Sequence, residues 1–310
     1  AHTVNKANSL TTVTGDTPDP SVFGQNYTVS VSVAAAAPGA GTPSGSVTVS
    51  DGTNTCPITL NGAGSGSCDL PSTNAGGKTL TATYSGDGSF NGSTGGAAHT
   101  VSTARTTTTI TGDAPDPTVF GQSYTVSVAV AAIAPGAGIP GGSVTVSDGA
   151  NSCSITLSGA GSGSCSLTLT AVGPRILTAT YAGNANFSGS SDTEDHAVGK
   201  AATTTSLVSS MNQVLEGQPV HFTSDVIATA PGSGTPTGFV QFYEGPTALG
   251  GPVALVDGVA VSPDITTLAL GPHAITAEYL GSTSYDPSTS DIRTVTVFSY
   301  ALYLPITLRQ

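Results

Sequence analysis

Apolar and polar residues alternate with a period of two over most of this chain, and the alternation predicts β-strands. Between Tyr27 and Val33, Tyr and Val occupy the odd positions, whereas Thr and Ser occupy the even ones. Such a strand buries one face and leaves the other in water. Short strands within one unit, separated by Gly and Pro turns, are typical of a β-sandwich. In the first unit we predict strands near residues 9–14, 26–34, 45–50, 55–60, 66–70, 78–84 and 96–101.

The same pattern returns at an offset of 97 residues. AHTV begins at Ala1 and again at Ala98, and GAGSGSC begins at Gly62 and again at Gly159. A third, more divergent copy contains APGSGTPTGFVQFYEG and HAITAEYLGSTSY, which align with APGAGTPSGSVTVSDG and TLTATYSGDGSF of the first copy. Repetition at a fixed period indicates tandem domains.

We therefore expect three tandem β-sandwich domains, over residues 8–101, 105–198 and 202–298. The linkers between them are short, so the domains should form a rod. Residues 1–7 then hold the last strand of a preceding repeat plus a linker, as in a slice of a longer array or a processed product. Residues 299–310 continue the alternation and predict an extra, apolar C-terminal strand.

Composition and charge narrow the possible partners. Only 8% of the 310 residues are charged, Trp is absent, and the net charge is −12. Because Lys and Arg form no cluster that could neutralise phosphates, nucleic acid is excluded as a partner. No apolar run reaches the roughly 18 residues that a membrane-spanning helix needs. Helical periodicity is also nearly missing, which favours an all-β fold.

The third copy resembles the bacterial immunoglobulin-like repeat of group 3, through TPTGFVQFYEG, LVDGVAV, LALGPHAITAEYLGSTSY and the closing RTVTV. The first copy carries SGSVTVSDG and LTATYSGDGSF in the same places, and the second carries GGSVTVSDG and LTATY, so the resemblance covers most of the chain. It implies immunoglobulin-like β-sandwiches of a secreted or cell-surface protein, where such repeats serve as spacers, stalks and adhesive arrays. A fold by itself does not assign a function.

The four cysteines form two equivalent pairs, Cys56 with Cys68 and Cys153 with Cys165. Each pair flanks GAGSG, where we predict a hairpin turn that brings the two cysteines opposite one another. A zinc site is the alternative, but it would need clustered cysteines or nearby histidines. Disulfides indicate an oxidising compartment, so we expect an extracellular or cell-surface location.

The histidines do not form a catalytic motif. His2, His99 and His196 are equivalent positions of successive copies, which favours a structural role on the last strand of each repeat. His221 and His273 lie in predicted strands of the third copy, and neither adjoins a triad-like motif. No pair of carboxylates recurs beside these histidines in the sequence to suggest acid–base chemistry. The sequence therefore predicts a protein that is not an enzyme and has no cofactor.

Acidic turns provide the remaining candidate for metal chemistry. GDTPDP and GDAPDP place two carboxylates close together, and Ca²⁺ prefers such oxygen ligands. The third copy lacks this motif, and Asp beside Pro is ordinary turn chemistry. We therefore assign no metal and keep four residues as weak calcium candidates: Asp16, Asp19, Asp113 and Asp116.

The C-terminal segment changes the parity of the alternation. Val295 and Val297 are odd, whereas the apolar positions from Phe298 onward are even, which implies a bulge or an opposite buried face. The tail either folds back on the third domain or adds as a strand to a neighbouring subunit. In the second case subunits would join head to tail through residues 1–8 and 298–310. The assembly candidates are Ala1, His2, Thr3, Val4, Phe298, Tyr300, Leu302, Leu304, Ile306 and Leu308.

The sequence thus favours a non-enzymatic structural subunit of an extracellular fibre, stalk or surface filament, with copies of itself as the partner. Two alternatives stay open. The chain could be a stalk segment of an adhesin whose binding domain lies outside it, with host or surface glycans as partners. It could also supply the spacer domains of a secreted hydrolase.

Overall fold

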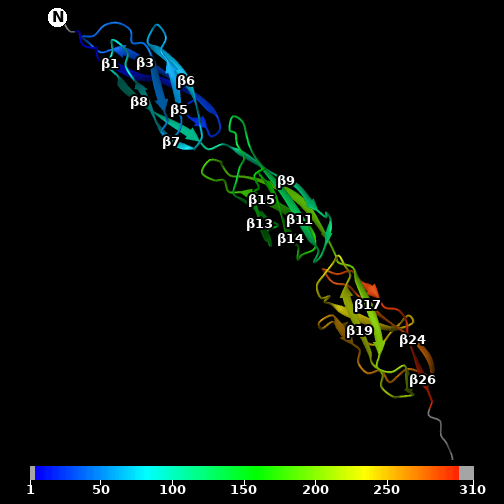
Figure 1. The fold of residues 1–310 in the computed structure, drawn as a ribbon. Coiled ribbons are helices and arrows are strands. Elements are labelled where there is room, and N and C mark those ends of the chain that lie inside the picture. The colour runs from blue at the N-terminus through cyan, green and yellow to red at the C-terminus, as the bar shows by residue number, and fades with distance from the viewer. Residues whose placement is uncertain (1–3, 300–310) are drawn as a thin grey trace, which may run out of the picture.

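The computed structural model describes residues 4–299, and over them the chain forms three β-sandwiches in a row. Figure 1 shows the first domain at the N-terminal end of an elongated particle and the third domain at the opposite end. The prediction of an all-β chain with tandem sandwiches is confirmed. Within residues 4–299 there is no helix with the length and hydropathy needed to cross a membrane.

The first domain packs a three-stranded sheet, in the order β1-β3-β6, against a five-stranded sheet, in the order β2-β8-β7-β4-β5. Neighbouring strands are antiparallel except β2, which pairs in parallel with β8. The alternation did not predict β2, because two residues are too few to show a period. The strands are β1 (Ser9–Thr17), β2 (Ser21–Val22), β3 (Asn26–Ala35), β4 (Ser46–Ser50), β5 (Thr55–Thr59), β6 (Ser65–Pro71), β7 (Gly76–Tyr84) and β8 (Ser93–Ser102).

The second domain repeats this topology, with sheets β14-β11-β9 and β10-β16-β15-β12-β13. Its short strand β10 again pairs in parallel with the last strand, β16. The strands are β9 (Thr106–Ala114), β10 (Thr118–Val119), β11 (Ser123–Ala132), β12 (Ser143–Ser147), β13 (Ser152–Thr156), β14 (Ser162–Thr168), β15 (Gly173–Tyr181) and β16 (Ser190–Gly199).

The third domain has the sheets β17-β19-β23 and β18-β26-β24-β20-β21, with β22 also paired to β20 and β25 to β24. The strands are β17 (Thr203–Ser209), β18 (Gln213–Leu215), β19 (Phe222–Ala228), β20 (Phe239–Glu244), β21 (Thr247–Ala248), β22 (Val253–Ala254), β23 (Val259–Val261), β24 (Gly271–Tyr279), β25 (Ser288–Thr289) and β26 (Arg293–Phe298).

The core of each domain lies between its two sheets, as the alternation predicts. Along β3, the side chains from Tyr27 to Val33 at odd positions are at most 2% exposed. Val47 and Val49 of β4 face them from the other sheet and are fully buried. Burial of each large apolar side chain contributes about 1.5–3 kcal/mol to stability, so these strands hold the sandwich together.

One disulfide connects the two sheets in each of the first two domains. Cys56 bonds to Cys68, with 6.0 Å between the Cα atoms, and Cys153 bonds to Cys165, with 6.1 Å. The pairs are those that the spacing predicts, but the expected hairpin is wrong. Strand β5 belongs to the large sheet and β6 to the small one, so residues 60–64 cross from one sheet to the other. Such a crossover and a hairpin give the same sequence spacing.

Candidate functional site

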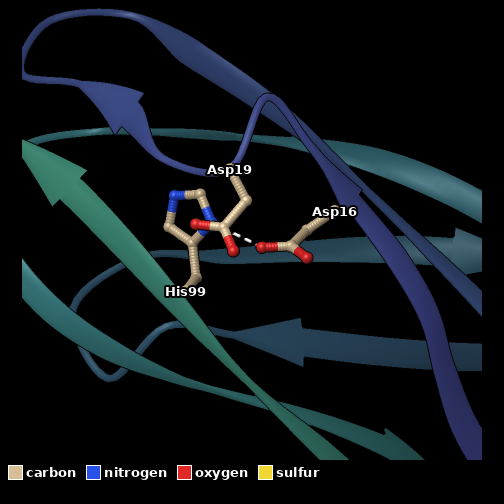
Figure 2. Close-up of side chains that lie close together, drawn as sticks. All are labelled: Asp16, Asp19 and His99. Atoms are coloured by element: carbon tan, nitrogen blue, oxygen red, sulfur yellow. Dashed lines mark hydrogen bonds and ion pairs between the residues drawn. The ribbon is translucent and has the colours of Figure 1, made fainter.

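A buried polar cluster lies between the two sheets of the first domain (Figure 2). It joins Asp16 of β1, Ser21 of β2 and His99 of β8. The His99 Nδ1 atom donates to Asp16 Oδ2 over 2.5 Å, and the Nε2 atom shares a hydrogen bond of 2.8 Å with Ser21 Oγ. Ser21 reaches the ring because the parallel pairing places β2 beside the end of β8.

Two further neighbours, Asp19 and Tyr27, hold the imidazole of His99 in place. The Asp19 Oδ1 atom lies 3.4 Å from His99 Nδ1 and accepts the backbone N–H of Thr100 over 3.0 Å. The ring of Tyr27 stacks on the imidazole with 3.8 Å between centroids. Burial, with the nearby Asp51 carboxylate, raises the pKa of the Tyr27 hydroxyl, so this stacked ring stays uncharged.

The second domain contains the same cluster. His196 Nδ1 lies 2.7 Å from Asp113 Oδ2, and His196 Nε2 lies 2.9 Å from the hydroxyl of Thr118. Asp116 takes the position of Asp19, with its Oδ1 atom 3.4 Å from His196 Nδ1. The ring of Tyr124 stacks on the imidazole with 4.2 Å between centroids.

The third domain fills the same space with apolar side chains. By strand register, Val214 stands where Ser21 stands, and Val295 stands where His99 stands. Both valines belong to the core of the third domain. The polar cluster is therefore one of two ways in which this fold fills the position.

The contacts from Ser21 through His99 to Asp16 follow the order of a hydrolytic triad. However, Ser21 is 0% exposed and His99 is 1% exposed, so no substrate can reach the hydroxyl. The cluster is a hydrogen-bond network that fixes β1 and β2 against β8. Sequence reasoning missed it because its members lie far apart in the chain. The available signal was that Asp, Ser or Thr, and His recur together in two copies and are absent together from the third.

The calcium candidates meet at these histidines. Asp16, Asp19 and His99 could each offer one ligand atom within 4.8 Å of the others, and so could Asp113, Asp116 and His196. A ring nitrogen lies between the carboxylates, whereas Ca²⁺ takes six to eight oxygen ligands. This donor set does not fit calcium. The carboxylates act as hydrogen-bond partners of the ring, and the absence of a structural metal stays a prediction.

A second feature of functional interest is the contact between the first and second domains. Phe23 lies in the turn between β2 and β3, and its ring packs edge-on against Phe187 with 5.1 Å between centroids. The Phe23 carbonyl accepts the N–H of Ala137 over 3.2 Å. Gly24 has a φ of +82°, and a Cβ there would lie 2.5 Å from the Ala137 carbonyl oxygen. The turn can approach the next domain this closely only because Gly24 has no side chain.

The contact between the second and third domains uses the equivalent residues. Phe120 packs edge-on against Tyr285 with 5.2 Å between centroids. The Phe120 carbonyl accepts the N–H of Ser233 over 3.3 Å, and the Ser233 hydroxyl donates to the Gly121 carbonyl over 2.6 Å. We call Phe23–Gly24 and Phe120–Gly121 the Phe–Gly turns. Their acceptor surfaces are Ala137, Gly138 and Phe187 in the second domain, and Ser233, Gly234 and Tyr285 in the third.

The assembly candidates are only partly within the described chain. Val4 is 86% exposed, and Phe298, at the end of β26, is 46% exposed. Strand β26 pairs with β18 and β24 on its two sides. The other candidates lie outside residues 4–299: Ala1, His2, Thr3, Tyr300, Leu302, Leu304, Ile306 and Leu308. Head-to-tail joining through them stays a prediction.

The chain is similar to several solved structures over most of its length. A tetra-tandem repeat from the extending region of a large adhesion protein is 13% identical, with 94% of this chain and 74% of that chain covered and a TM-score of 0.48. Invasin, a bacterial integrin-binding protein, is 15% identical over 94% and 60% of the two chains, with a TM-score of 0.44. An I-band fragment of titin is 11% identical over 96% and 97%, with a TM-score of 0.38.

Among curated proteins, none matches the sequence. The sequence does match the profile of the family described as "Bacterial Ig-like domain (group 3)", over residues 13–104, 110–199 and 207–298. These three segments correspond to the three sandwiches and together cover most of the chain. The resemblance noted in the sequence is thereby confirmed, and the chain belongs to the bacterial Ig-like domain family of group 3, of which it contains three copies.

Proposed function

We propose that this chain is a non-enzymatic spacer segment of an extracellular or cell-surface protein. In this role the row of three domains keeps whatever adjoins its two ends a fixed distance apart. The observation that carries the proposal is the repeated use of the Phe–Gly turn, which packs each domain on the next in the same way. Linkers of only a few residues, 103–105 and 200–202, support it because they limit how far neighbouring domains can swing.

Two further observations favour this role over the alternatives. The triad-like cluster is closed to substrates, since Ser21 and His99 are buried, which disfavours catalysis within these domains. The disulfides of the first two domains are typical of proteins in an oxidising compartment outside the cytosol. The segment could support either an adhesin or a surface filament. Fibre formation by strand exchange, and binding of glycans, are finer hypotheses that need separate tests.

The test is small-angle scattering from the full chain. We expect a rod with a length on the order of 100 Å, because strands of about ten residues rise about 3.3 Å per residue along each domain. The variant Phe23→Ala/Phe120→Ala should populate bent shapes and lower the mean radius of gyration. The matched control is Leu10→Ala/Val208→Ala, which shortens two exposed apolar side chains away from the domain contacts. Identical scattering from both variants, or a compact wild-type particle, would count against a spacer role.

A further inference from the structure

The first domain also carries an acceptor surface at its N-terminal end. Ala40, Gly41 and Phe90 occupy the positions of Ala137, Gly138 and Phe187 at the repeat offset of 97 residues. The local geometry is the same: Ala7 pairs with Phe90 through an isolated parallel bridge, as Ala104 does with Phe187. Phe90 is 4% exposed and Phe187 is 5% exposed, so the two rings are held in equivalent, buried positions.

At Ala7 and Gly41 this surface is less covered than its two counterparts, whereas Phe90 is as buried as Phe187 and Tyr285. Ala7 is half-buried, whereas Ala104 and Ala201 are fully buried. A Cβ added at Gly138 would lie 3.3 Å from the Phe23 ring and 3.4 Å from Phe187. A Cβ added at Gly41 would have one neighbour among the described residues, Phe90 at 3.6 Å. The described residues thus supply no second aromatic ring at Gly41.

We propose that the acceptor surface formed by Ala40, Gly41 and Phe90 binds the Phe–Gly turn of another repeat of this kind, placed before the first domain. The partner is defined by chemistry: an aromatic ring to pack edge-on against Phe90, followed by a glycine. The glycine is needed because a Cβ at Gly24 or Gly121 would lie 2.5 Å from atoms of the next domain. This inference rests on the proposed function, because it assumes that Phe–Gly turns order consecutive domains.

The third domain of a second copy does not fit as this partner. Glu216 takes the position of Phe23, since its N–H donates to the Phe298 carbonyl as the Phe23 N–H donates to that of Ser102. Glu216 is exposed in the structure. A carboxylate pressed against Phe90 would lose its hydration without a compensating partner, which is costly. The third domain of one copy therefore does not bind the acceptor surface of another copy through a Phe–Gly contact.

The experiment adds a repeat to the full chain. Residues 5–97 are duplicated in front of Ala1, so that the added copy ends in Ala1–Val4 and reproduces the sequence of residues 5–101. Phe23 of the added copy is changed to Trp, which is then the only Trp because the chain has none. Two single-Trp variants of the 310-residue chain serve as references. Phe23→Trp places the Trp in a domain contact that the structure contains, and Glu216→Trp places it at an exposed position. The readouts are Trp emission and quenching by iodide.

We expect the Trp of the added copy to match the Phe23→Trp reference, with blue-shifted emission and several-fold weaker quenching than Glu216→Trp. Protection in the Phe23→Trp reference but not in the added copy would overturn this inference alone. Exposure in both would instead overturn the domain contact on which the proposed function rests.

As a second measurement, Phe23→Glu in the added copy should increase bending in small-angle scattering. The control is Thr81→Glu in the added copy, which adds the same charge at an exposed position and should leave the bending unchanged. Equal bending in the two variants would also overturn the inference.

Discussion

At the scale of single residues, the buried histidine clusters are the most specific feature of the first two domains. His99 uses both ring nitrogens and one ring face, against Asp16, Ser21 and Tyr27. A buried polar network of this kind is costly when one member is removed, because the others lose their partner without regaining water. The valines of the third domain avoid that cost with an apolar packing.

We predict that Asp16→Ala lowers the free energy of unfolding of the first domain by about 1–3 kcal/mol, the typical cost of leaving a buried polar group unpaired. His99 Nδ1 would retain only Asp19, at 3.4 Å. The control is Asp69→Ala, which removes an exposed acceptor of the Thr28 hydroxyl and should change stability by less than about 0.5 kcal/mol. Urea unfolding, with hydrogen exchange measured on peptides of each domain, provides the comparison. Equal effects of the two substitutions would mean that the cluster contributes nothing specific.

The third domain has its own histidine contact, and it predicts a dependence on pH. His273 Nδ1 lies 2.5 Å from Glu244 Oε1, and His273 Nε2 lies 2.6 Å from the Ala269 carbonyl oxygen. Burial lowers the pKa of the His273 imidazole, but the hydrogen bonds to Glu244 and Ala269 and the Glu244 charge raise it by more. The net pKa of His273 lies above its ordinary value.

Because the folded state binds this proton more tightly than the unfolded state, its stabilising effect is complete below the ordinary histidine pKa of about 6.5. The effect is lost as the pH rises through the raised pKa of the folded state. We therefore expect the free energy of unfolding of the third domain to fall as the pH rises above about 6.5. Glu244→Gln should flatten this dependence. A wild-type profile that is parallel to the Glu244→Gln profile would refute the assignment.

At the scale of secondary-structure elements, the disulfides and the short parallel strands determine how the two sheets of each domain are held together. Cys56 and Cys68 join the edge strands β5 and β6 of different sheets, so the bond closes one side of the sandwich. In the third domain Leu249 and Ser262 occupy the equivalent positions, as their backbone hydrogen bonds to Phe242 and Phe222 show. No covalent bond closes that side of the third domain. The three domains should therefore respond differently to a reductant.

We predict that reduction destabilises the first and second domains by up to about 3 kcal/mol each and leaves the third unchanged. The estimate is the loop-closure entropy for a short loop, here with a sequence separation of 12 residues. Calorimetry with and without a reductant gives the shift in each unfolding transition. As a control, Cys56→Ser/Cys68→Ser should reproduce the shift in the first domain only. The same shift in all three transitions would show that the effect is not due to these bonds.

At the scale of the whole molecule, the Phe–Gly contacts give the array a direction, because the first and second domains offer the turn at their C-terminal ends and the second and third receive it at their N-terminal ends. Figure 1 shows the consequence, with the domains following one another along one line. Glu216 interrupts this scheme at the third domain. Any end-to-end joining of whole copies would therefore need another contact, and the terminal segments are the remaining candidates.

We predict that, if copies join by strand exchange, deletion of residues 300–310 abolishes the assembly and leaves the three domains folded. The physical reason is the row of apolar side chains in that segment, because burying them against a partner sheet would stabilise the assembly. Electron microscopy and light scattering of the full and shortened chains would measure assembly. Fibres that form equally well from both chains would exclude the tail as the contact. A full chain that stays monomeric at high concentration would exclude strand exchange itself.

Local sequence patterns were sufficient for the class of fold and its repetition. The alternation along β3 and the offset of 97 residues define strands and tandem domains, because strand periodicity is a property of the backbone and needs no long-range contact. The cysteine pairing also followed from spacing, since residues close in the chain have few possible partners.

The tertiary structure alone decided what depends on strand order and on packing between sheets. Spacing could not show that Cys56 and Cys68 join two sheets, because a hairpin and a crossover need the same number of residues. Nor could it bring Asp16 and Ser21 to His99, or Phe23 to Phe187, since these residues lie far apart along the chain. Such contacts arise only when the sheets of each domain, and then the domains themselves, pack together.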